Sequence, residues 1–558
     1  MVKRVFDFVY KEVRGLHQAA FVLALFAFGS QVLAVVRDRL LAHSFGAGTE
    51  LDLYYAAFRI PDLLYVLFAS VLSVYVLLPF VNRFTAKDGP KAGGRVLSQV
   101  FSLFLIIYAS VALVLMFAAP VYLPMLFPGL AEDMSTLVLL AQILLLQPFL
   151  LGLSSLCGVV TQMSQRFILY AISPLLYNIG IIVGIIFFYP IFGLPGLVVG
   201  VVLGALGHFG VQLPFVFRSD YKFSLTSSFD WPLIKEVLFV SVPRAFTLSV
   251  SQLVLLVLVG MATVMTAGSV SVFQFAYNLQ SVPLAIIGMS YSVAAFPTLS
   301  ILYAQKDQQG FNVQLLTALR HIIFWSVPII GLVIVLRAQI VRVLLGSGAF
   351  DWGDTRLTAA VLAVFILSLT AESILLLLTR AFYACGRTFI PLWIAATSAA
   401  VAIFLAGVFR EVYRTHSVIQ DTVARWLRLE DVTGTEILVL IAAFVIGQLL
   451  QLSLMIFVSR NVFVIRYRSL LVLFTQALIA TLAGAGAAYG TLSFIVNGIN
   501  QETFVGILLQ GAAAGIVGLG VVVFVYWFLK APELGELYRS FRGKLQKSAV
   551  VAPQSDTL

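Results

Sequence analysis

Long apolar runs recur along the chain, and short polar connections separate them. A run of about 20 residues crosses the apolar core of a bilayer as a helix, whereas a spanning strand needs only about 10 residues of alternating polarity. The pattern therefore predicts an all-α, polytopic membrane protein with about 14 transmembrane helices. The predicted spans lie near 18–46, 50–80, 96–119, 134–160, 167–189, 194–217, 236–263, 270–300, 318–345, 357–380, 389–410, 435–459, 469–495 and 503–529.

The polar segments outside these spans are predicted to lie at the membrane surface. Residues 1–17 form a basic N-terminus and residues 530–558 a basic tail, both of which suit an anionic inner leaflet. Residues 411–434 form a long insert whose apolar positions recur at helical spacing, which predicts an external amphipathic helix in the membrane interface. The positions are Val412, Ile419, Val423, Trp426 and Leu427.

The chain contains an internal repeat. Three features of the first half recur about 221 residues later, and six spans lie within each copy, so both copies have the same orientation. The pairs are Ser30-Gln31 with Ser251-Gln252, Pro61 with Pro283, and Arg166 with Arg387. We therefore expect two parallel six-helix lobes, 18–218 and 236–459, followed by helices 13 and 14 in residues 469–529.

Composition agrees with a membrane protein and gives its expected orientation. Hydrophobic residues make up 61% of the chain and charged residues 11%, with a formal net charge of +10. Most of the Lys and Arg residues fall in loops on the side shared by both termini, which predicts cytoplasmic termini. This distribution explains the positive charge without a nucleic-acid partner. Cys157 and Cys385 lie in apolar surroundings, so neither a metal cluster nor a disulfide framework is expected.

Charged residues interrupt the first two spans. Arg37, Asp38 and Arg39 lie within the first, and Asp52 and Arg59 lie within the second. Charges inside a span are costly and by default indicate a functional site. The stretch from Gln31 to Pro79 therefore predicts a solvated, charged cavity between helices.

Two kinds of residue in this stretch and its repeat are candidate hinges. Gly46 and Gly48 lie between the first two spans, while Pro61 and Pro283 lie within spans 2 and 8. A proline removes a helical hydrogen bond and allows a bend. Bends where the lobes flex and ordinary tolerated kinks are both compatible with this pattern.

The same stretch resembles the MurJ (MviN) lipid II flippases of the multidrug/oligosaccharidyl-lipid/polysaccharide exporter superfamily. The similarity lies in V-R-D-x-x-x-A-x-x-F-G-A-G-x-x-x-D, residues 36–52, and in A-F-R-I-P, residues 57–61. It continues in Arg166-Phe167 with Pro174 and Asn178, in VRVLLGSGAFD at 341–351, and in R-A-F-Y-A-x-G at 380–386. The resemblance implies fourteen helices in two lobes, with helices 13 and 14 forming a groove for a lipid tail.

The resemblance also implies a function and a set of substrate-binding residues. The expected activity is translocation of lipid II, an undecaprenyl-pyrophosphate-linked peptidoglycan precursor, from the inner to the outer leaflet by alternating access. Arg37 is implied to engage the pyrophosphate, because a guanidinium keeps its charge and can donate paired hydrogen bonds. The implied binding set is Arg37, Asp38, Arg39, Asp52 and Arg59.

Each of these residues also has a structural interpretation, which for Arg39 rests on the variability of its position in the family motif. Arg37 could snorkel at the outer end of span 1, and Asp38 could form a simple ion pair. Asp52 follows Thr49 in a capping-box-like T-x-x-D start of span 2. Arg59 could pair with Asp62 on the same helix face. The sequence leaves these alternatives open.

Glu372 is a carboxylate deep in an apolar span of the second lobe. It is a candidate site for a coupling cation or proton. Pairing with an arginine, or a permanently protonated carboxyl, would also account for it. No resident cofactor is expected, and the energy for transport would come from a coupling cation or from the membrane potential.

Three positions depart from the family pattern. Gln31, Tyr65 and Asn278 stand where family members commonly carry cationic residues. A different polyprenyl-pyrophosphate oligosaccharide, a drug/cation antiporter of the same superfamily, and a non-transporting scaffold for cell-wall synthesis are therefore the alternative functions. In each case the expected location is the bacterial inner membrane and the expected partners include membrane lipids. The cell-wall synthesis machinery is a further expected partner, and no catalytic constellation indicates an enzyme.

Overall fold

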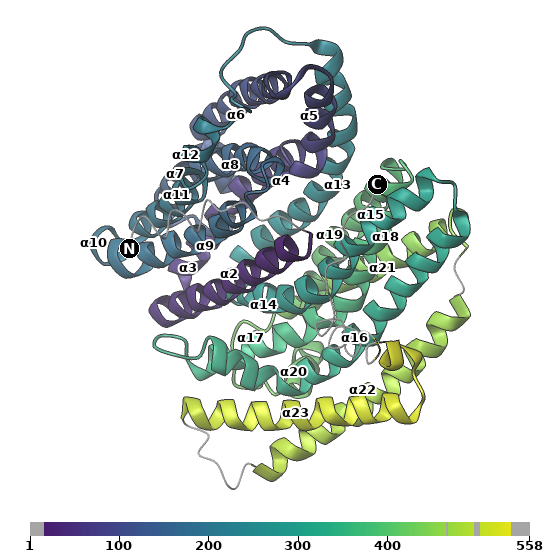
Figure 1. The fold of residues 1–558 in the computed structure, drawn as a ribbon. Coiled ribbons are helices and arrows are strands. Elements are labelled where there is room, and N and C mark those ends of the chain that lie inside the picture. Colours follow the sequence, from purple (N-terminus) through teal and green to yellow (C-terminus); the bar gives the residue numbers. More distant parts are fainter. Residues whose placement is uncertain (1–15, 465–466, 496–502, 537–538, 540–558) are drawn as a thin grey trace. The chain divides into compact units, whose positions relative to one another are not determined.

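Helices form the regular structure of this protein. The computed structural model describes residues 16–464, 467–495, 503–536 and 539, and within these ranges no strand occurs (Figure 1). The helices of the first half are α2 (Leu16–Phe45), α3 (Thr49–Ala57), α4 (Arg59–Val71), α5 (Val74–Asp88), α6 (Pro90–Leu126), η1 (Pro128–Leu130), α7 (Met134–Leu144), α8 (Leu146–Met163), α9 (Phe167–Val183), η2 (Gly184–Phe188), α10 (Tyr189–Phe192), α11 (Leu194–Gly210) and α12 (Leu213–Arg218).

The second half continues the same helical pattern. Its elements are α13 (Trp231–Thr263), α14 (Ser269–Leu284), η3 (Ala285–Met289), α15 (Ser290–Ala304), α16 (Gln308–Leu344), α17 (Trp352–Phe365), η4 (Ile366–Ser368), α18 (Leu369–Ala384), α19 (Phe389–Thr415), α20 (Ser417–Leu427), α21 (Ile437–Ser459), α22 (Tyr467–Ile495) and α23 (Phe504–Phe528).

Thirteen helical stretches of the described residues are long and apolar enough to cross a membrane. They follow predicted spans 2 to 14 in order, and the first predicted span, 18–46, forms the 30-residue helix α2. Many stretches run past the predicted ends: α6 begins at Pro90, and α16 begins at Gln308. Helices keep their backbone hydrogen bonds beyond the apolar core, so polar flanks extend them. The predicted all-α, polytopic fold is confirmed.

Several spans contain a break in the helix. Pro61 has no N–H to donate to the carbonyl of Ala57, and the helix is interrupted at Phe58, between α3 and α4. Pro283 is followed by the π-helical turn η3, and η4 is a 3₁₀ turn between α17 and α18. Irregular turns of this kind inside a helix frequently lie at functional sites.

The internal repeat recurs in the local backbone geometry. Gln165 and Gly386 are 221 positions apart, and both have positive φ values, +55° and +70°. In each turn, the amide of the next residue donates to a carbonyl five residues earlier: Arg166 to Thr161 at 2.8 Å, and Arg387 to Phe382 at 2.9 Å. Equivalent spans end in equivalent caps.

The chain divides into two compact units. Unit 1 comprises residues 1–275, 344–361 and 388–447; unit 2 comprises 276–343, 362–387 and 448–558. In unit 1, α9 packs against α11 through glycines, because a Cβ on Gly180 would lie 2.2 Å from the Cα of Gly204. Helix α2 packs against α9, and α13 packs against α4 and α19.

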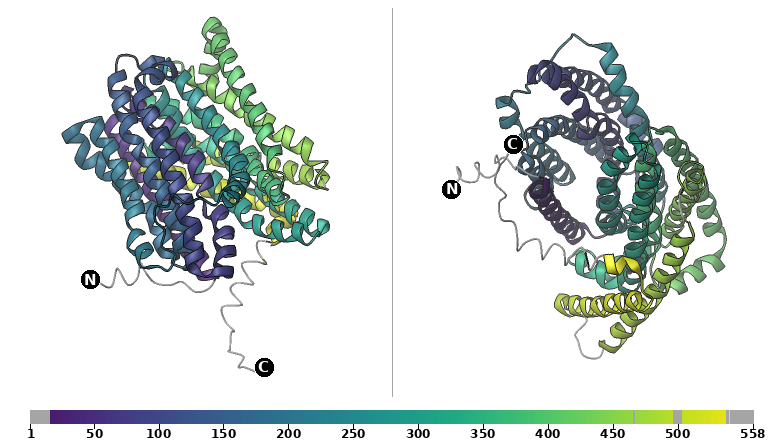
Figure 2. Two further views of the ribbon diagram at one scale, coloured as in Figure 1. Left: turned by 90° about the horizontal axis from the view of Figure 1, so that it is seen from above. Right: turned by 45° about the vertical axis from the view of Figure 1, so that its right-hand side comes forward.

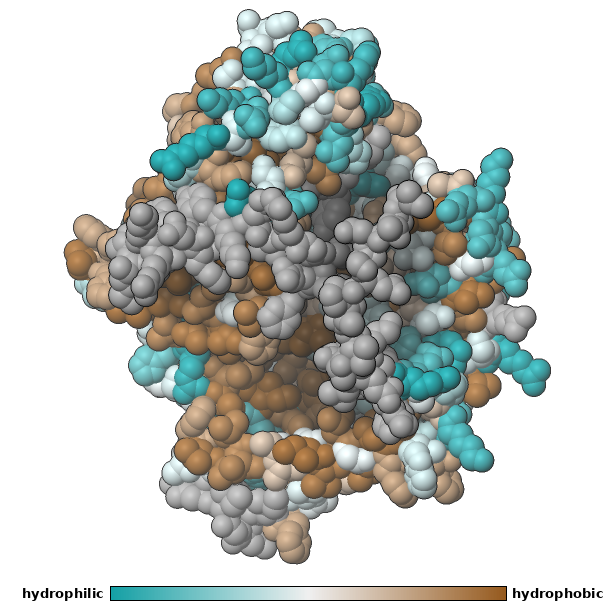
Figure 3. Space-filling view, viewed as in Figure 1, coloured by the Kyte–Doolittle hydropathy of each residue, from teal (hydrophilic) through white to brown (hydrophobic). Residues whose placement is uncertain are grey.

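In unit 2, α22 and α23 lie side by side (Figures 1 and 2). Helix α16 packs on this pair, and the Tyr526 hydroxyl donates to the carbonyl of Phe324 at 2.8 Å. The outer surface of α23 carries exposed apolar side chains, which Figure 3 shows in brown. The exposed apolar residues of α23 include Val505, Ile516, Phe524 and Phe528. Apolar exposure along a span-length helix is expected of a surface that faces lipid.

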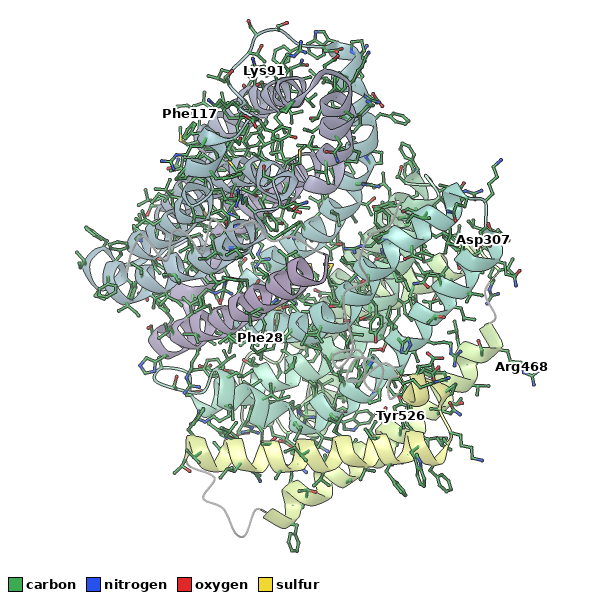
Figure 4. The ribbon with its side chains drawn as sticks, viewed as in Figure 1. Phe28, Lys91, Phe117, Asp307, Arg468 and Tyr526 are labelled. Carbon is green, nitrogen blue, oxygen red and sulfur yellow. The ribbon has the colours of Figure 1, made fainter. Side chains whose placement is uncertain are left out.

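Figure 4 illustrates the contrast between apolar flanks and polar ends. Phe28 on α2 and Phe117 on α6 are exposed, and Lys91 lies at the polar beginning of α6 (Figure 4). The predicted insert 411–434 contains the helix α20, on which Val418 and Trp426 are 74% and 84% exposed. A helix is therefore present within the insert, although Val412 lies on α19, and amphipathic contact with the interface stays a prediction. Most of the basic N-terminus and of the tail lies outside the described residues.

Candidate functional site

Arg37 and Asp38 form an ion pair on α2. The Nε and Nη2 of Arg37 donate to Oδ1 of Asp38 at 2.9 and 2.8 Å. The two side chains keep 21% and 11% of their exposure, so they are largely enclosed by unit 1 but still reachable. The ion-pair interpretation of Asp38 is therefore correct, and it is compatible with the predicted orienting role.

Asn178 on α9 fixes the other end of the guanidinium. Its Oδ1 accepts from Nη1 of Arg37 at 3.1 Å, and its Nδ2 donates to the Ser30 hydroxyl and to the carbonyl of Pro174. The predicted site did not include Asn178. A polar amide within the apolar span 5 was the available signal, but its partner lies 141 positions earlier in the chain.

The guanidinium retains hydrogen-bonding capacity. Arginine has five N–H donors, and three of them are used within the described residues: one on Nε, one on Nη1 and one on Nη2. One N–H therefore remains on each terminal nitrogen of Arg37. Two such donors can hold two oxygens of a phosphate or carboxylate together.

Arg59 lies at the start of α4 and is 6% exposed. Its Nη2 donates to Oε1 of Gln274, at the beginning of α14, and it also interacts electrostatically with Asp62. The predicted Arg59–Asp62 interaction is therefore part of a larger contact between α4 and α14. Arg39 lies two residues beyond Arg37 and is partly buried.

Asp52 links α3 to the beginning of α14. It is 3% exposed, and its carboxylate accepts from the amide of Gly268 at 2.8 Å and from the amide and hydroxyl of Ser271 at 2.7 and 2.6 Å. The N-cap of its own helix is Gly48, without a side-chain cap bond. The capping-box interpretation is therefore wrong for α3, because the carboxylate satisfies the free amides of another helix.

The loop from Phe45 to Gly48 is held by the segment that leads into α17 and by the first turn of that helix. Gly46 has a φ of +60°, and a Cβ there would lie 2.7 Å from the carbonyl oxygen of Ala349. The amide of Ala47 donates to Oδ2 of Asp354 at 3.1 Å, and the amide of Ala349 donates to the carbonyl of His43 at 2.9 Å. Gly46 thus has a geometric reason to be glycine. The hinge roles of Gly46, Gly48, Pro61 and Pro283 stay predictions.

Glu372 lies in unit 2, on the first turn of α18. Its Oε1 accepts from the Ser368 hydroxyl and from Nε2 of Gln280, the latter at 3.1 Å. The bonds that reach Glu372 in the described part of the chain come from these two neutral side chains. The alternative of a pair with arginine is therefore not observed there.

The positions that depart from the family pattern are polar but uncharged. Gln31 is exposed on α2, Tyr65 is partly buried on α4, and Asn278 is partly buried on α14. Arg37 and Arg59 are buried or half-buried cations of the first two spans that contact other helices.

Fold and site together define a class of protein: a multi-pass, all-α membrane protein with buried charges inside its apolar helices. The structure is similar to "Lipid II flippase MurJ, inward closed conformation", with a TM-score of 0.72 and 20% identity, over 91% of this chain and 99% of that one. It is also similar to an inward-facing multidrug resistance MATE family transporter of the MOP superfamily, with a TM-score of 0.63 and 15% identity, over 77% and 94% of the two chains.

The chain belongs to the MurJ family. The family model described as "Lipid II flippase MurJ" matches residues 41–497. A relative named "Probable lipid II flippase MurJ", from Rhizobium tropici, is 25% identical over 417 residues, which cover 72% of this chain and 76% of the relative. The resemblance stated from residues 36–61 and the later segments is thereby confirmed.

Proposed function

We propose that this protein translocates lipid II from the inner to the outer leaflet of the bacterial inner membrane by alternating access. The observation that carries the proposal is the guanidinium of Arg37: a permanent positive charge within a long apolar helix, with one N–H left on each terminal nitrogen. Family membership supports the nature of the cargo. The transport step makes and breaks no covalent bond.

The chemistry of the headgroup fits this arrangement. A pyrophosphate presents several anionic oxygens, and a guanidinium binds two of them in parallel without losing its charge. Asp38 and Asn178 would keep the guanidinium oriented while the substrate exchanges. Because Asp38 already offsets one positive charge, the net attraction is moderate, which suits a carrier that must release its cargo.

The contacts around Asp52 and Gly46 suggest how one side of the substrate path is closed. Carboxylate-to-amide bonds and tight loop packing hold the beginnings of α3 and α14 together. We propose that these bonds open when the protein releases the headgroup and form again afterwards. The breaks near Pro61 and Pro283 would then absorb the backbone change.

The surroundings of the protein follow from the same proposal. Both termini would lie in the cytoplasm, where the positive-inside rule places the basic loops. The exposed apolar surface of α23 would contact membrane lipids and the polyprenyl tail of the substrate. The α20 helix would lie at the outer interface of the membrane. An interaction with the cell-wall synthesis machinery would place the flipped precursor beside the enzymes that use it.

Complementation tests the proposal. Cells depleted of their own lipid II flippase are supplied with the wild-type chain, with Arg37→Ala, or with the control variant Arg95→Ala. Arg95 is an exposed arginine on α6. We expect the wild type and Arg95→Ala to restore growth and lipid II flipping, and Arg37→Ala to fail at equal membrane abundance. Equal rescue by Arg37→Ala would refute the assigned role. Failure of a correctly inserted wild type would refute lipid II as the cargo.

A further inference from the structure

Glu372 lies where two interrupted spans of unit 2 meet. Ser368 ends the 3₁₀ turn η4, four residues before Glu372 on the same span. Gln280 comes from α14, three residues before Pro283 and shortly before the π-helical turn η3. Gly288 of η3 packs directly against α18, because a Cβ there would lie 2.8 Å from the Cα of Ser373. The carboxylate therefore sits between two irregular backbone segments.

The hydrogen atoms at this site can be counted. Ser368 has one hydroxyl hydrogen, yet its Oγ lies within hydrogen-bonding distance of two acceptors, the carbonyl of Phe365 at 2.7 Å and Oε1 of Glu372. If Glu372 is ionised, the Ser368 hydrogen can go to the carboxylate. If Glu372 carries a proton, the carboxyl donates to Ser368 Oγ and the Ser368 hydrogen goes to Phe365.

Gln280 provides a second acceptor for the same proton. Its side chain is fully buried, its Nε2 donates to Glu372, and its Oε1 has no hydrogen-bond partner. Leaving a buried amide oxygen without a donor is unfavourable, because its lost hydrogen bond to water is not replaced. Rotation of the amide by 180° would exchange its oxygen and nitrogen, so a protonated Glu372 could donate to the oxygen. Both protonation states of the carboxyl thus have partners in place.

The ligand set suits a proton better than a metal cation. Hard cations such as Ca²⁺ take six to eight oxygen ligands, several of them carboxylates, whereas this site has one carboxylate. No group of three or more His, Cys, Asp or Glu suitable for a metal occurs in the described ranges. The titratable or charged groups on the helices around α18, and on α18 itself besides Glu372, are Tyr277 of α14, Tyr291 and Tyr303 of α15, Arg320, His321, Arg337 and Arg342 of α16, and Arg380 and Tyr383 of α18.

We propose that Glu372, Ser368 and Gln280 form a proton-binding site whose occupancy controls the break at η4. Protonation of Glu372 returns the Ser368 hydrogen to the Phe365 carbonyl and stabilises the 3₁₀ turn. Loss of that proton turns the Ser368 hydrogen away from the Phe365 carbonyl and toward the Glu372 carboxylate, which weakens the 3₁₀ turn. A proton taken up on one side of the membrane and released on the other would then bias the helix geometry during transport, and this coupling step rests on the proposed function.

Infrared pH-difference spectroscopy of the purified protein in nanodiscs tests the proton site without any transport. The wild type should show a protonated-carboxyl C=O band that appears and disappears with pH. Glu372→Gln should lose the band, whereas Glu132→Gln, which alters an exposed loop carboxyl, should keep it. Gln280→Leu should shift the midpoint to higher pH, because the charge-assisted bond that Gln280 donates to the ionised form is stronger than the bond that it accepts from the protonated form.

Three outcomes would overturn the proton site: no titrating band in the wild type, an unchanged band in Glu372→Gln, or a band that responds to added NaCl at constant pH. Reconstituted lipid II flipping then tests the coupling. An imposed pH gradient should change the wild-type rate several-fold, and this response should vanish in Glu372→Gln and persist in Glu132→Gln. A wild-type rate that is measurable but insensitive to the gradient would overturn the coupling alone, whereas no flipping at all would contradict the proposed function.

Discussion

Replacing Asp52 by alanine should loosen the beginning of a helix more than 200 residues away in sequence. Its carboxylate accepts from the amides of Gly268 and Ser271 and from the Ser271 hydroxyl, all in a buried setting. Loss of a helix cap costs about 0.5 to 2 kcal/mol. Each buried donor left without an acceptor adds about 1 to 3 kcal/mol. Partial relaxation and water entry reduce the sum, so we expect a local destabilisation of about 2 to 4 kcal/mol.

Hydrogen exchange gives the direct readout of that loss. A destabilisation of about 2 kcal/mol raises the population of the open state by about 30-fold, since about 1.4 kcal/mol corresponds to a factor of ten. Peptides covering residues 264–275 should therefore exchange at least about 30-fold faster in Asp52→Ala. Glu50→Ala changes an exposed acid in the same helical turn and should leave these peptides unaffected.

Asp52→Asn refines the test, because the amide keeps one acceptor oxygen but loses the charge. Its exchange rate should fall between those of the wild type and Asp52→Ala. A double-mutant cycle with Ser271→Ala should give a coupling energy of about 1 kcal/mol or more. Unchanged exchange over residues 264–275 in Asp52→Ala, with a folded protein, would refute the assigned cap.

Three further predictions follow from the geometry. Gly46→Ala should lower the melting temperature measurably, because it places a Cβ at positive φ and 2.7 Å from a backbone oxygen. The cost is at least about 1 kcal/mol. The control Gly48→Ala, at a φ of −133°, should change the melting temperature little. Asn178→Ala should reduce flipping several-fold at unchanged abundance, while Asn178→Asp should bind Arg37 too tightly and also slow release. Arg356→Ala should speed tryptic cleavage at Arg425 on α20, because Arg356 binds Asp431 and the Arg428 carbonyl and so holds the segment after α20. The same guanidinium holds the pKa of Asp431 below its ordinary value. The Arg356–Asp431 ion pair is therefore fully formed at neutral pH and is lost as the pH falls through that lowered pKa.

The sequence was sufficient for the elements that depend on local pattern. Apolar run length predicted the spans, and matching residues of the repeat such as Arg166 and Arg387 could be recognised, because both are properties of short segments. The adjacent pair Arg37-Asp38 could be found for the same reason, since two charges in an apolar run are conspicuous without knowledge of their surroundings. Ends of helices were less predictable, because a helix continues past the apolar core wherever its polar residues can reach water.

The contacts that complete the site depend on helices far apart in the chain. Asn178 binds Arg37 across 141 positions, and Asp52 reaches Gly268 across 216. The T-x-x-D spacing at Thr49 predicted a cap for the nearest helix, but tertiary packing directed the carboxylate to α14. Glu372 was found from its position in an apolar span. Its partners Ser368 and Gln280 required the structure, because Gln280 lies 92 positions earlier.

Flipping of lipid II by the purified protein in liposomes measures the central claim most directly. Wild type, Arg37→Lys, Arg37→Ala and Arg95→Ala are reconstituted at equal density, and headgroups reaching the opposite leaflet are counted over time. We expect wild-type rates for Arg95→Ala, a clear loss for Arg37→Lys, which keeps the charge but not the paired donors, and near-background rates for Arg37→Ala. Flipping by Arg37→Ala at the wild-type rate would contradict the role of the Arg37 guanidinium in binding the headgroup.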